Sequence, residues 1–294
     1  MKDLAPYGFI LLWSSSFVTA RVGLALVSPL LFVAVRLVAA AALLGLFLAA
    51  RGESLAPLRG RWLHLAIAGA LVNGVTLSAF HVGMVTENVA IMALVQATSP
   101  MLIALAAVPL LGERLRAHQV LGLVLGTAGV ALVVLSRGLT GPAGWGAIGL
   151  GFLGALGLAS GTVYFGRVGR DVPLVQATAV QVGAGAALTI AAMLLFERPH
   201  AVWTAAAVTA VAWNVLAVSI GAMALYYYML NRGTAGRVAA NFYLIPGTVA
   251  VLGATLLGER LTALAVLGLA VASLGVFLVA RKDPGRRAGA RGRR

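Results

Sequence analysis

The chain has 294 residues, of which 61% are hydrophobic and only 10% are charged. Soluble domains carry about 25% charged residues, so this composition excludes an ordinary water-soluble protein and predicts one embedded in lipid. The net charge of +14 does not indicate a nucleic-acid-binding protein, because seven of the 22 Lys and Arg residues lie in the tail 281–294. A basic tail of this kind usually contacts anionic lipid headgroups, and the lack of cysteine excludes disulfides and thiolate metal sites.

Ten apolar runs of membrane-spanning length follow one another along the chain. A helix needs about 20 apolar residues to cross a bilayer, and a lone strand would leave its backbone groups without partners in hydrocarbon. The first run lacks a small-residue cleavage site, so we expect a retained helix rather than a signal peptide. The ten predicted spans lie near residues 6–26, 29–50, 62–82, 88–111, 118–136, 145–166, 173–196, 203–230, 236–257 and 262–280.

Two stretches that lie 146 residues apart are closely alike. Residues 100–115 and 246–261 both begin with proline and both end in Leu-Gly-Glu-Arg-Leu. A duplicated half in a polytopic membrane protein is typical of transporters built from internal repeats. We therefore predict a first five-helix repeat at 1–139, a second at 140–281 and a basic cytoplasmic tail at 282–294. Two further glycine pairs match at the same offset, Gly122 with Gly268 and Gly129 with Gly275.

Lys and Arg residues concentrate on one side of the predicted spans. If the N-terminus lies in the cytoplasm, 17 of them fall on the cytoplasmic side and three on the other. Basic connections are retained in the cytoplasm, so both termini are predicted to be cytoplasmic. Because each half has five helices, the second half then enters the membrane from the opposite side. The predicted fold is an all-α membrane protein with ten transmembrane helices, arranged as two inverted-topology five-helix repeats around a central cavity.

The eight acidic residues all fall in predicted connections or at helix ends, and Glu87 lies nearest to a span. A carrier driven by protons or sodium usually keeps a carboxylate inside the membrane, so the pattern favours facilitated transport. The sequence shows no phosphate-binding loop, no His and Glu set at metal-binding spacing and no catalytic triad. We therefore expect a protein that is not an enzyme and that holds neither a metal nor a cofactor.

The third span carries polar residues in the middle of the membrane. Asn73, Leu77 and Phe80 are spaced to share one helix face, with His81 at its edge. An asparagine in hydrocarbon needs a partner or water. Two interpretations of His81 remain open: a structural histidine bonded to a neighbouring carbonyl, or a cavity residue that contacts the cargo.

Prolines lie near the middle of the fourth and ninth spans, at Pro100 and Pro246. Proline removes a helical hydrogen bond and kinks the helix. Interrupted helices at matching places in two halves indicate a binding site and its gates, so we predict that both prolines are hinge positions. Polar, aromatic and sulfur-containing neighbours that we assign to the cargo site are Gln96, Ser99 and Met101 in the first half, and Asn241 and Tyr243 in the second.

Three other spans contribute candidate residues. Trp13 and Ser16 in the first span and Tyr164 in the sixth either line a cavity or pack against neighbouring helices. Arg36 lies inside the second span, where a guanidinium needs carbonyls, water or an anion. Its role stays open between a structural one and an anion or cargo contact, and the equivalent position in the second half is Gln181.

These motifs together resemble the EamA-type family of the drug/metabolite transporter superfamily. The matching pieces are residues 12–17, Ser28-Pro29 followed by the in-helix Arg36, and the two proline helices that run into Leu-Gly-Glu-Arg-Leu. The first half is also similar to the aromatic amino acid exporters of that family. The resemblance implies ten helices around a central cavity, with the fifth and tenth peripheral, and export of amino acids or small metabolites by alternating access. It also implies cavity positions on spans one, three, four, six, eight and nine.

The predicted function is an alternating-access transporter of the bacterial inner (plasma) membrane that exports amino acids, aromatic ones in particular, and related small metabolites. The predicted partners are the small-molecule cargo and the lipid bilayer. Two alternatives stay open: a carrier of phosphorylated or nucleotide-linked metabolites, which predicts several cations in the cavity, and a non-transporting membrane subunit. In the leading hypothesis Trp13, Phe80, Tyr164 and Tyr243 stack on an aromatic cargo, while Asn73, His81, Gln96 and Asn241 bond its amino and carboxylate groups.

Overall fold

The computed structural model describes residues 4–87, 89–99, 101–103, 105–106, 117–136, 142–168, 172–222, 225, 244–259 and 262–280. Within these ranges the protein is all-α, as predicted, and its β-structure is limited to one isolated antiparallel bridge between Val27 and Ala201. The helices are α1 (Ala5–Leu24), α2 (Pro29–Ala50), η1 (Ala56–Leu58), α3 (Trp62–Gly69), η2 (Ala70–Val75), α4 (Thr76–Thr86), α5 (Val89–Gln96), α7 (Ala117–Ser136), α8 (Pro142–Val168), α9 (Leu174–Phe196), α10 (Ala205–Trp213), η3 (Asn214–Ala222), α13 (Ile245–Leu256) and α14 (Ala263–Ala280).

The helices follow the apolar runs. Five stretches of the described chain are long and apolar enough to cross a membrane: Pro29–Ala50, Trp62–Thr86, Gly144–Val168, Leu174–Phe196 and Ala205–Ala222. Large apolar side chains lie exposed on their outer faces, among them Leu46 at 68% and Phe196 at 83% exposure, as lipid contact requires. The predicted count of ten spans includes segments outside the described residues.

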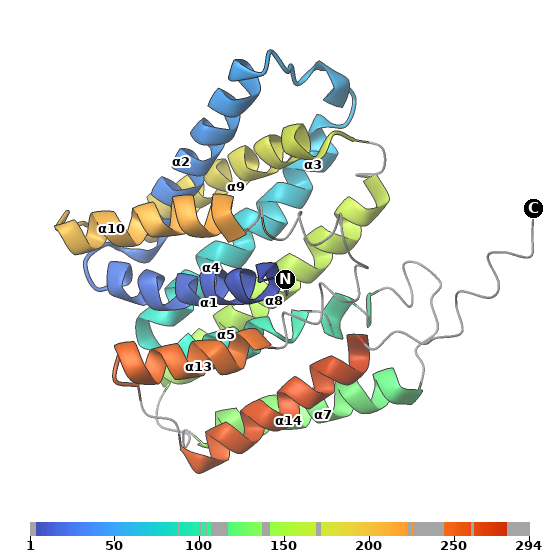
Figure 1. Ribbon diagram of the computed structural model, residues 1–294, viewed down its shortest axis with the longest axis vertical. Coiled ribbons are helices and arrows are strands. Elements are labelled where there is room, and N and C mark those ends of the chain that lie inside the picture. Colours follow the sequence, from blue (N-terminus) through green and yellow to red (C-terminus); the bar gives the residue numbers. More distant parts are fainter. Residues whose placement is uncertain are drawn as a thin grey trace, which may run out of the picture.

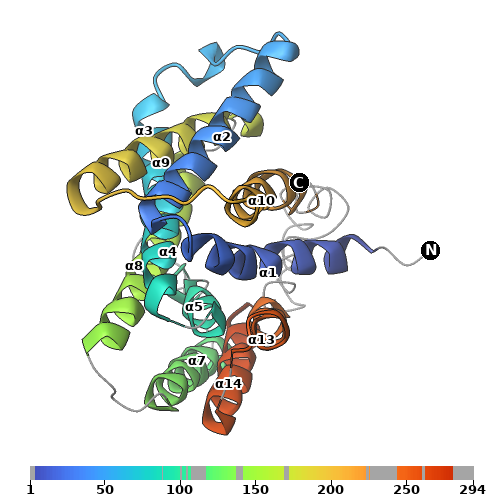
Figure 2. The same ribbon diagram turned by 90° about the vertical axis from the view of Figure 1, so that its left-hand side faces the viewer.

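The helices form an elongated array (Figures 1 and 2). α2, α3 and α9 gather at one end, and α7 and α14 lie side by side at the other. α1, α5 and α13 lie between these two groups. The main apolar core lies among the middle helices, around Phe9 of α1, Phe32 of α2, Phe80 of α4 and Met92 of α5.

Contacts between helix ends define two opposite faces of this array. On the first, which we call the Glu53 face, Glu53 after α2 meets Gln176 in the first turn of α9. On the second, which we call the Glu197 face, Glu197 after α9 meets Ser28 before α2. α2 and α9 therefore run antiparallel. α1 ends on the Glu197 face, whereas α8 ends on the Glu53 face, where Tyr164 bonds His64 near the start of α3.

The pair α7 and α14 crosses at glycines. A Cβ atom at Gly275 would lie 2.6 Å from the carbonyl oxygen of Gly122, and a Cβ atom at Gly129 would lie 2.6 Å from the carbonyl oxygen of Gly268. Gly275 and Gly129 lie 146 residues apart, as do Gly268 and Gly122, and 146 is the offset of the sequence repeat. Each of the two contacts is therefore the counterpart of the other. Small residues allow such close helix approach in membranes, so the matched glycines form a reciprocal interface.

Two wide π-helical turns interrupt matching helices. η2 separates α3 from α4, and η3 continues α10. In each, a hydroxyl bonds a carbonyl five residues earlier: Thr76 donates to Leu71 at 3.0 Å, and Ser219 donates to Asn214 at 3.0 Å. The two donors, Thr76 and Ser219, lie 143 residues apart in the sequence, and so do the two acceptors, Leu71 and Asn214. π-turns are frequent at functional sites, and here they occur at equivalent places in the two halves.

Candidate functional site

The candidate residues of the third predicted span, in η2 and α4, contact different neighbours. The ring of Phe80 packs on α8, where a Cβ atom at Gly154 would lie 2.8 Å from the ring. Leu77 instead packs against the apolar cluster of α2 and α9 that contains Val33 and Ala186. Asn73 lies against Gly185 of α9. The predicted common face of Asn73, Leu77 and Phe80 is therefore divided between two neighbours.

The division falls within α4, because Leu77 and Phe80 both belong to this helix. Residues three apart on an α-helix lie roughly 60° apart around its axis, and here that difference is enough to give the two side chains different neighbours. The π-turn η2 (Ala70–Val75) comes before both residues, so it turns α4 as a whole relative to α3 and does not separate them. Hydrophobic periodicity does not indicate which neighbouring helix each edge of an apolar helix contacts.

A cavity of about 460 Å³ lies between α8 and the segment that follows α5. Its walls are mainly apolar and include Leu102, Leu105 and Ala159. At its edge on the Glu53 face lie Tyr164 and Arg167, both near the end of α8. The Tyr164 hydroxyl lies 2.6 Å from Nδ1 of His64, which holds the phenol at this edge. Among the predicted site residues within the described ranges, Tyr164 is the one that lines the cavity.

The candidates on α1 and just after α5 make contacts within their own segments. Trp13 packs on Phe9, with ring centroids 5.6 Å apart, and Ser16 donates to the Trp13 carbonyl at 2.6 Å. Ser99 is buried and donates to the carbonyl of Gln96 at 2.7 Å. These hydroxyls bond backbone carbonyls of their own helix or turn, so a cargo contact would require them to rotate.

Met101 and the two prolines occupy three different settings. The thioether of Met101 packs on Gly126 of α7, away from the cavity that its neighbour Leu102 lines. Pro246 lies in the first turn of the described helix α13, where proline removes no helical hydrogen bond. Because residues 226–243 lie outside the described residues, the predicted hinge role of Pro246 remains a prediction. Pro100, Asn241 and Tyr243 lie outside the described residues.

A buried polar cluster lies between α1, α2 and η3. Nη1 of Arg36 donates to Oδ1 of Asn214 at 2.9 Å. Nδ2 of Asn214 donates to Oγ1 of Thr19 at 2.9 Å and to the Ala210 carbonyl at 3.0 Å. These two bonds determine which way the amide of Asn214 faces, so its oxygen must point at the guanidinium. Sequence reasoning missed Asn214, although an asparagine within an apolar span is the same signal that identified Asn73.

His81 lies on the neighbouring side of this cluster. Its ring stacks on Phe32, with centroids 5.6 Å apart, and Phe32 lies one helical turn before Arg36. Nδ1 of His81 lies 2.7 Å from the Leu77 carbonyl, which is the structural bond that one interpretation predicted. Among the described residues, Nε2 of His81 and Nε of Arg36 are buried without a hydrogen-bond partner. The cluster therefore contains hydrogen-bonded groups together with two buried nitrogen atoms that have no described partner, Nε of Arg36 and Nε2 of His81.

Glu197 caps the start of α2 from the other repeat. Its carboxylate accepts the Ser28 hydroxyl at 2.7 Å and the backbone N–H groups of Leu30 at 2.9 Å and Leu31 at 3.0 Å. The first turn of a helix has free N–H groups and a positive dipole end. A carboxylate there joins the two halves on the Glu197 face.

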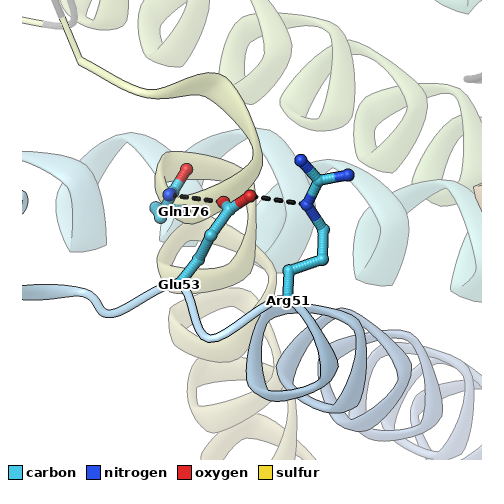
Figure 3. A network of polar contacts seen from close by, with 3 residues as sticks. All are labelled: Arg51, Glu53 and Gln176. Atoms are coloured by element: carbon cyan, nitrogen blue, oxygen red, sulfur yellow. Dashed lines mark hydrogen bonds and ion pairs between the residues drawn. The ribbon is translucent and has the colours of Figure 1, made fainter.

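Glu53 makes the related contact on the opposite face (Figure 3). Its carboxylate accepts hydrogen bonds from Nε2 of Gln176 at 2.8 Å and from Nε of Arg51 at 2.6 Å. Glu53 and Glu197 lie 144 residues apart. Glu53 follows α2, whose start contacts Glu197, and Glu197 follows α9, whose first turn contacts Glu53. The two contacts are thus repeated on the two faces, and each joins a residue of one half to the first turn of a helix in the other.

Glu87 is more deeply buried than its place in a predicted connection suggested. It follows the end of α4 and is 4% exposed. Nearby, Oε1 of Glu259 accepts the backbone N–H of Val89 at the start of α5, at 3.2 Å. Two carboxylates therefore flank the start of α5, which makes Glu87 the acidic side chain to examine in a test of ion coupling.

Comparisons with known proteins agree with this architecture. The model of the EamA-like transporter family matches residues 4–135 and again 145–281. The uncharacterized inner membrane transporter YedA of Escherichia coli (strain K12) is 32% identical over 281 residues, which cover 94% of this chain and 89% of YedA. The uncharacterized transporter YvbV of Bacillus subtilis (strain 168) is 26% identical over 289 residues, which cover 96% of this chain and 92% of YvbV.

A crystal structure of a protein without a stated function has the same fold. It superimposes with a TM-score of 0.64 at 24% sequence identity and covers 94% of both chains. None of these names specifies a cargo, so the predicted similarity to aromatic amino acid exporters remains a prediction. Because the family model matches both halves over almost their whole length, the chain belongs to the EamA-like transporter family and is a membrane transporter.

Proposed function

We propose that the protein is an inner-membrane transporter that exports amino acids, aromatic ones in particular, by facilitated alternating access. The observation that carries this proposal is the apolar cavity beside Tyr164, whose volume of about 460 Å³ falls within the roughly 300–1,000 Å³ of small-molecule sites. An aromatic side chain suits apolar walls with one phenol at the edge. The membrane assignment is supported by YedA, which is named an inner membrane transporter.

The transport mechanism that we propose uses two inverted repeats, 1–139 and 140–281. Four observations support it: the family model matches twice, the α7–α14 contacts are reciprocal, the π-turns match, and α1 and α8 end on opposite faces. In such transporters the cargo site is exposed to one side and then to the other. The Glu53 and Glu197 contacts would break in turn, each opening its own face.

Orientation in the membrane follows from charge. Basic residues of the Glu53 face include Arg51, Arg59 and Arg61, whereas the Glu197 face carries Arg198. By the positive-inside rule the Glu53 face would be the cytoplasmic one, in keeping with our proposal that both termini are cytoplasmic. The cavity, whose edge includes Arg167, would thus load from the cytoplasmic side, as export requires.

Uptake into liposomes tests the function. We expect purified protein to take up labelled phenylalanine and tryptophan in a saturable way without a pH gradient, and leucine more slowly. Acceleration by a pH gradient would contradict the facilitated mechanism. Absence of uptake of all three, with protein shown to be folded, would contradict the amino acid cargo. Preference for a phosphorylated metabolite would then favour the alternative function, a carrier of phosphorylated or nucleotide-linked metabolites, whose anionic cargo could contact the buried cation Arg36.

Filling the cavity tests its role. Ala159→Trp places an indole among the lining side chains. A single methylene in a pocket already changes specificity roughly tenfold or more, so we expect uptake to fall by at least that factor. The matched control is Leu153→Trp, which alters the same helix at a lipid-exposed position, 49% exposed. Equal uptake by both variants would show that the cargo passes elsewhere.

A further inference from the structure

Arg36 is a buried cation whose charge is not neutralised by any described carboxylate. The side chain is 8% exposed, and its hydrogen bonding among the described residues is limited to the neutral amide of Asn214. A guanidinium has five N–H donors, and a charge inside a membrane normally faces a partner, an ion pathway or a cargo. The open Nε of Arg36 is therefore a donor that suits an anionic oxygen.

The fold does not need this charge to pack. The interface of α2 with η3 has an equivalent in the interface of α9 with η2. There Leu71 occupies the place of Asn214, because both carbonyls accept the hydroxyl five residues later, and Gln181 occupies the place of Arg36. Gly69 closes that interface directly against the backbone of Gln181. Because the corresponding interface of α9 with η2 packs without a charged side chain at these places, we infer that the Arg36–Asn214 pair serves a purpose other than packing.

His81 supplies the complementary group. Its Nδ1 must carry the proton, because the Leu77 carbonyl can only accept a hydrogen bond. In the neutral imidazole Nε2 is then a bare acceptor, and it is buried without a described partner. Nε2 of His81 can accept a hydrogen bond from an ammonium, and the nearby Arg36 guanidinium can donate to a carboxylate. The two groups together match a molecule that carries both charges.

We propose that Arg36 and His81 form the head-group site for an α-amino acid: the carboxylate binds the Nε edge of Arg36, and the ammonium donates to Nε2 of His81. Asn214 holds the guanidinium in place through Oδ1. This inference rests on the proposed amino acid cargo and names the groups that recognise it, but it does not rest on the cavity beside Tyr164, which neither Arg36 nor His81 lines. The cluster is enclosed by α1, α2, α4 and η3, so the cargo enters it when α1 and η3 separate from α2 during alternating access.

Ligand-induced stabilisation tests the site without transport. A ligand that binds the folded state raises the unfolding temperature, and this is measured on purified protein in detergent. The probes are L-phenylalanine, L-phenylalaninamide without the carboxylate, 3-phenylpropionate without the ammonium, and inorganic phosphate. We expect phenylalanine to bind about 30-fold or more tightly than the amide, as for a buried charge pair that loses one partner.

Two variants separate recognition from folding. Arg36→Gln should abolish the preference for phenylalanine over its amide. Asn214→Asp supplies an internal carboxylate at the position 2.9 Å from Arg36, so it should keep or raise stability and yet abolish the same preference. A merely structural role for Arg36 would leave the preference intact in Asn214→Asp. The control Arg59→Gln removes an exposed charge and should behave like the unaltered protein.

The outcomes distinguish this inference from the proposed function. Equal binding of phenylalanine and its amide to the unaltered protein, together with normal uptake, would overturn the head-group site and leave the amino acid cargo standing. Stabilisation by 3-phenylpropionate that requires Arg36, without any uptake of amino acids, would keep the carboxylate site and overturn both the His81 contact and the proposed cargo. Stronger stabilisation by phosphate than by carboxylates would overturn the carboxylate assignment.

Discussion

Glu197→Ala is expected to lower the free energy of unfolding by about 2–3 kcal/mol, because three donors lose a charged acceptor. These donors are the Ser28 hydroxyl and the first-turn N–H groups of Leu30 and Leu31. The loss also removes a negative charge from the positive end of α2. Denaturant unfolding in detergent measures the stability, and Glu197→Gln, which keeps one oxygen acceptor, should recover part of it.

The same substitution should change the accessibility of the two faces. The protein has no cysteine, so a single cysteine at Ala210 or Ala177, both at most 4% exposed, reports opening near the Glu197 face or the Glu53 face. Glu197→Ala should speed thiol labelling at Ala210→Cys, and Glu53→Ala should speed it at Ala177→Cys. Faster labelling of both reporters by either substitution would indicate general loosening instead of alternating access.

Gly275→Leu is expected to lower the free energy of unfolding by about 3 kcal/mol or more, because overfilling a tight contact forces the backbones apart. A Cβ atom there would lie 2.6 Å from the Gly122 carbonyl oxygen and 2.7 Å from the Cα atom of Gly126. These are backbone atoms of α7 and cannot rotate away. The measurement is the unfolding midpoint in detergent together with the monodisperse fraction in size-exclusion chromatography.

Gly129→Leu should have a closely similar effect, because it meets the equivalent backbone atoms of α14. Once one substitution has separated the helices, the second has little left to disrupt. The double variant should therefore be less destabilised than the sum of the two single variants. Gly45→Leu is the control, because a Cβ atom at Gly45 meets no atom within 4 Å. Two additive effects would show that the glycines act independently and not within one interface.

Both predictions depend on features repeated in the two halves, and the polar cluster is the exception. Glu53 and Glu197 occur once in each half, as do Gly129 and Gly275. Arg36 has no charged equivalent. We infer that the repeated residues serve the scaffold and its two faces, while the unrepeated ones serve the cargo. Such a division would allow one fold to carry different cargoes.

The amino-acid sequence by itself determined the membrane class, the positions of the described helices and the matched glycines of α7 and α14. It could do so because apolar length and short-range spacing are local properties that lipid enforces on every span. Family membership followed from motifs such as Ser28-Pro29 with Arg36, and the family comparison confirmed it. The hinge roles of Pro100 and Pro246 and the contacts of Asn241 and Tyr243 remain predictions.

Only the tertiary structure decided which side chains meet. It separated Phe80 from Asn73 and Leu77, because α8 packs on one edge of this helical segment and α9 packs on another, which the spacing within one helix does not encode. It paired Arg36 with Asn214, which lies 178 residues away, and it brought Glu197 to the start of α2 across 166 or more residues. Contacts at such separations depend on how helices pack, and packing is decided by the shapes of both surfaces together and not by the pattern of either one.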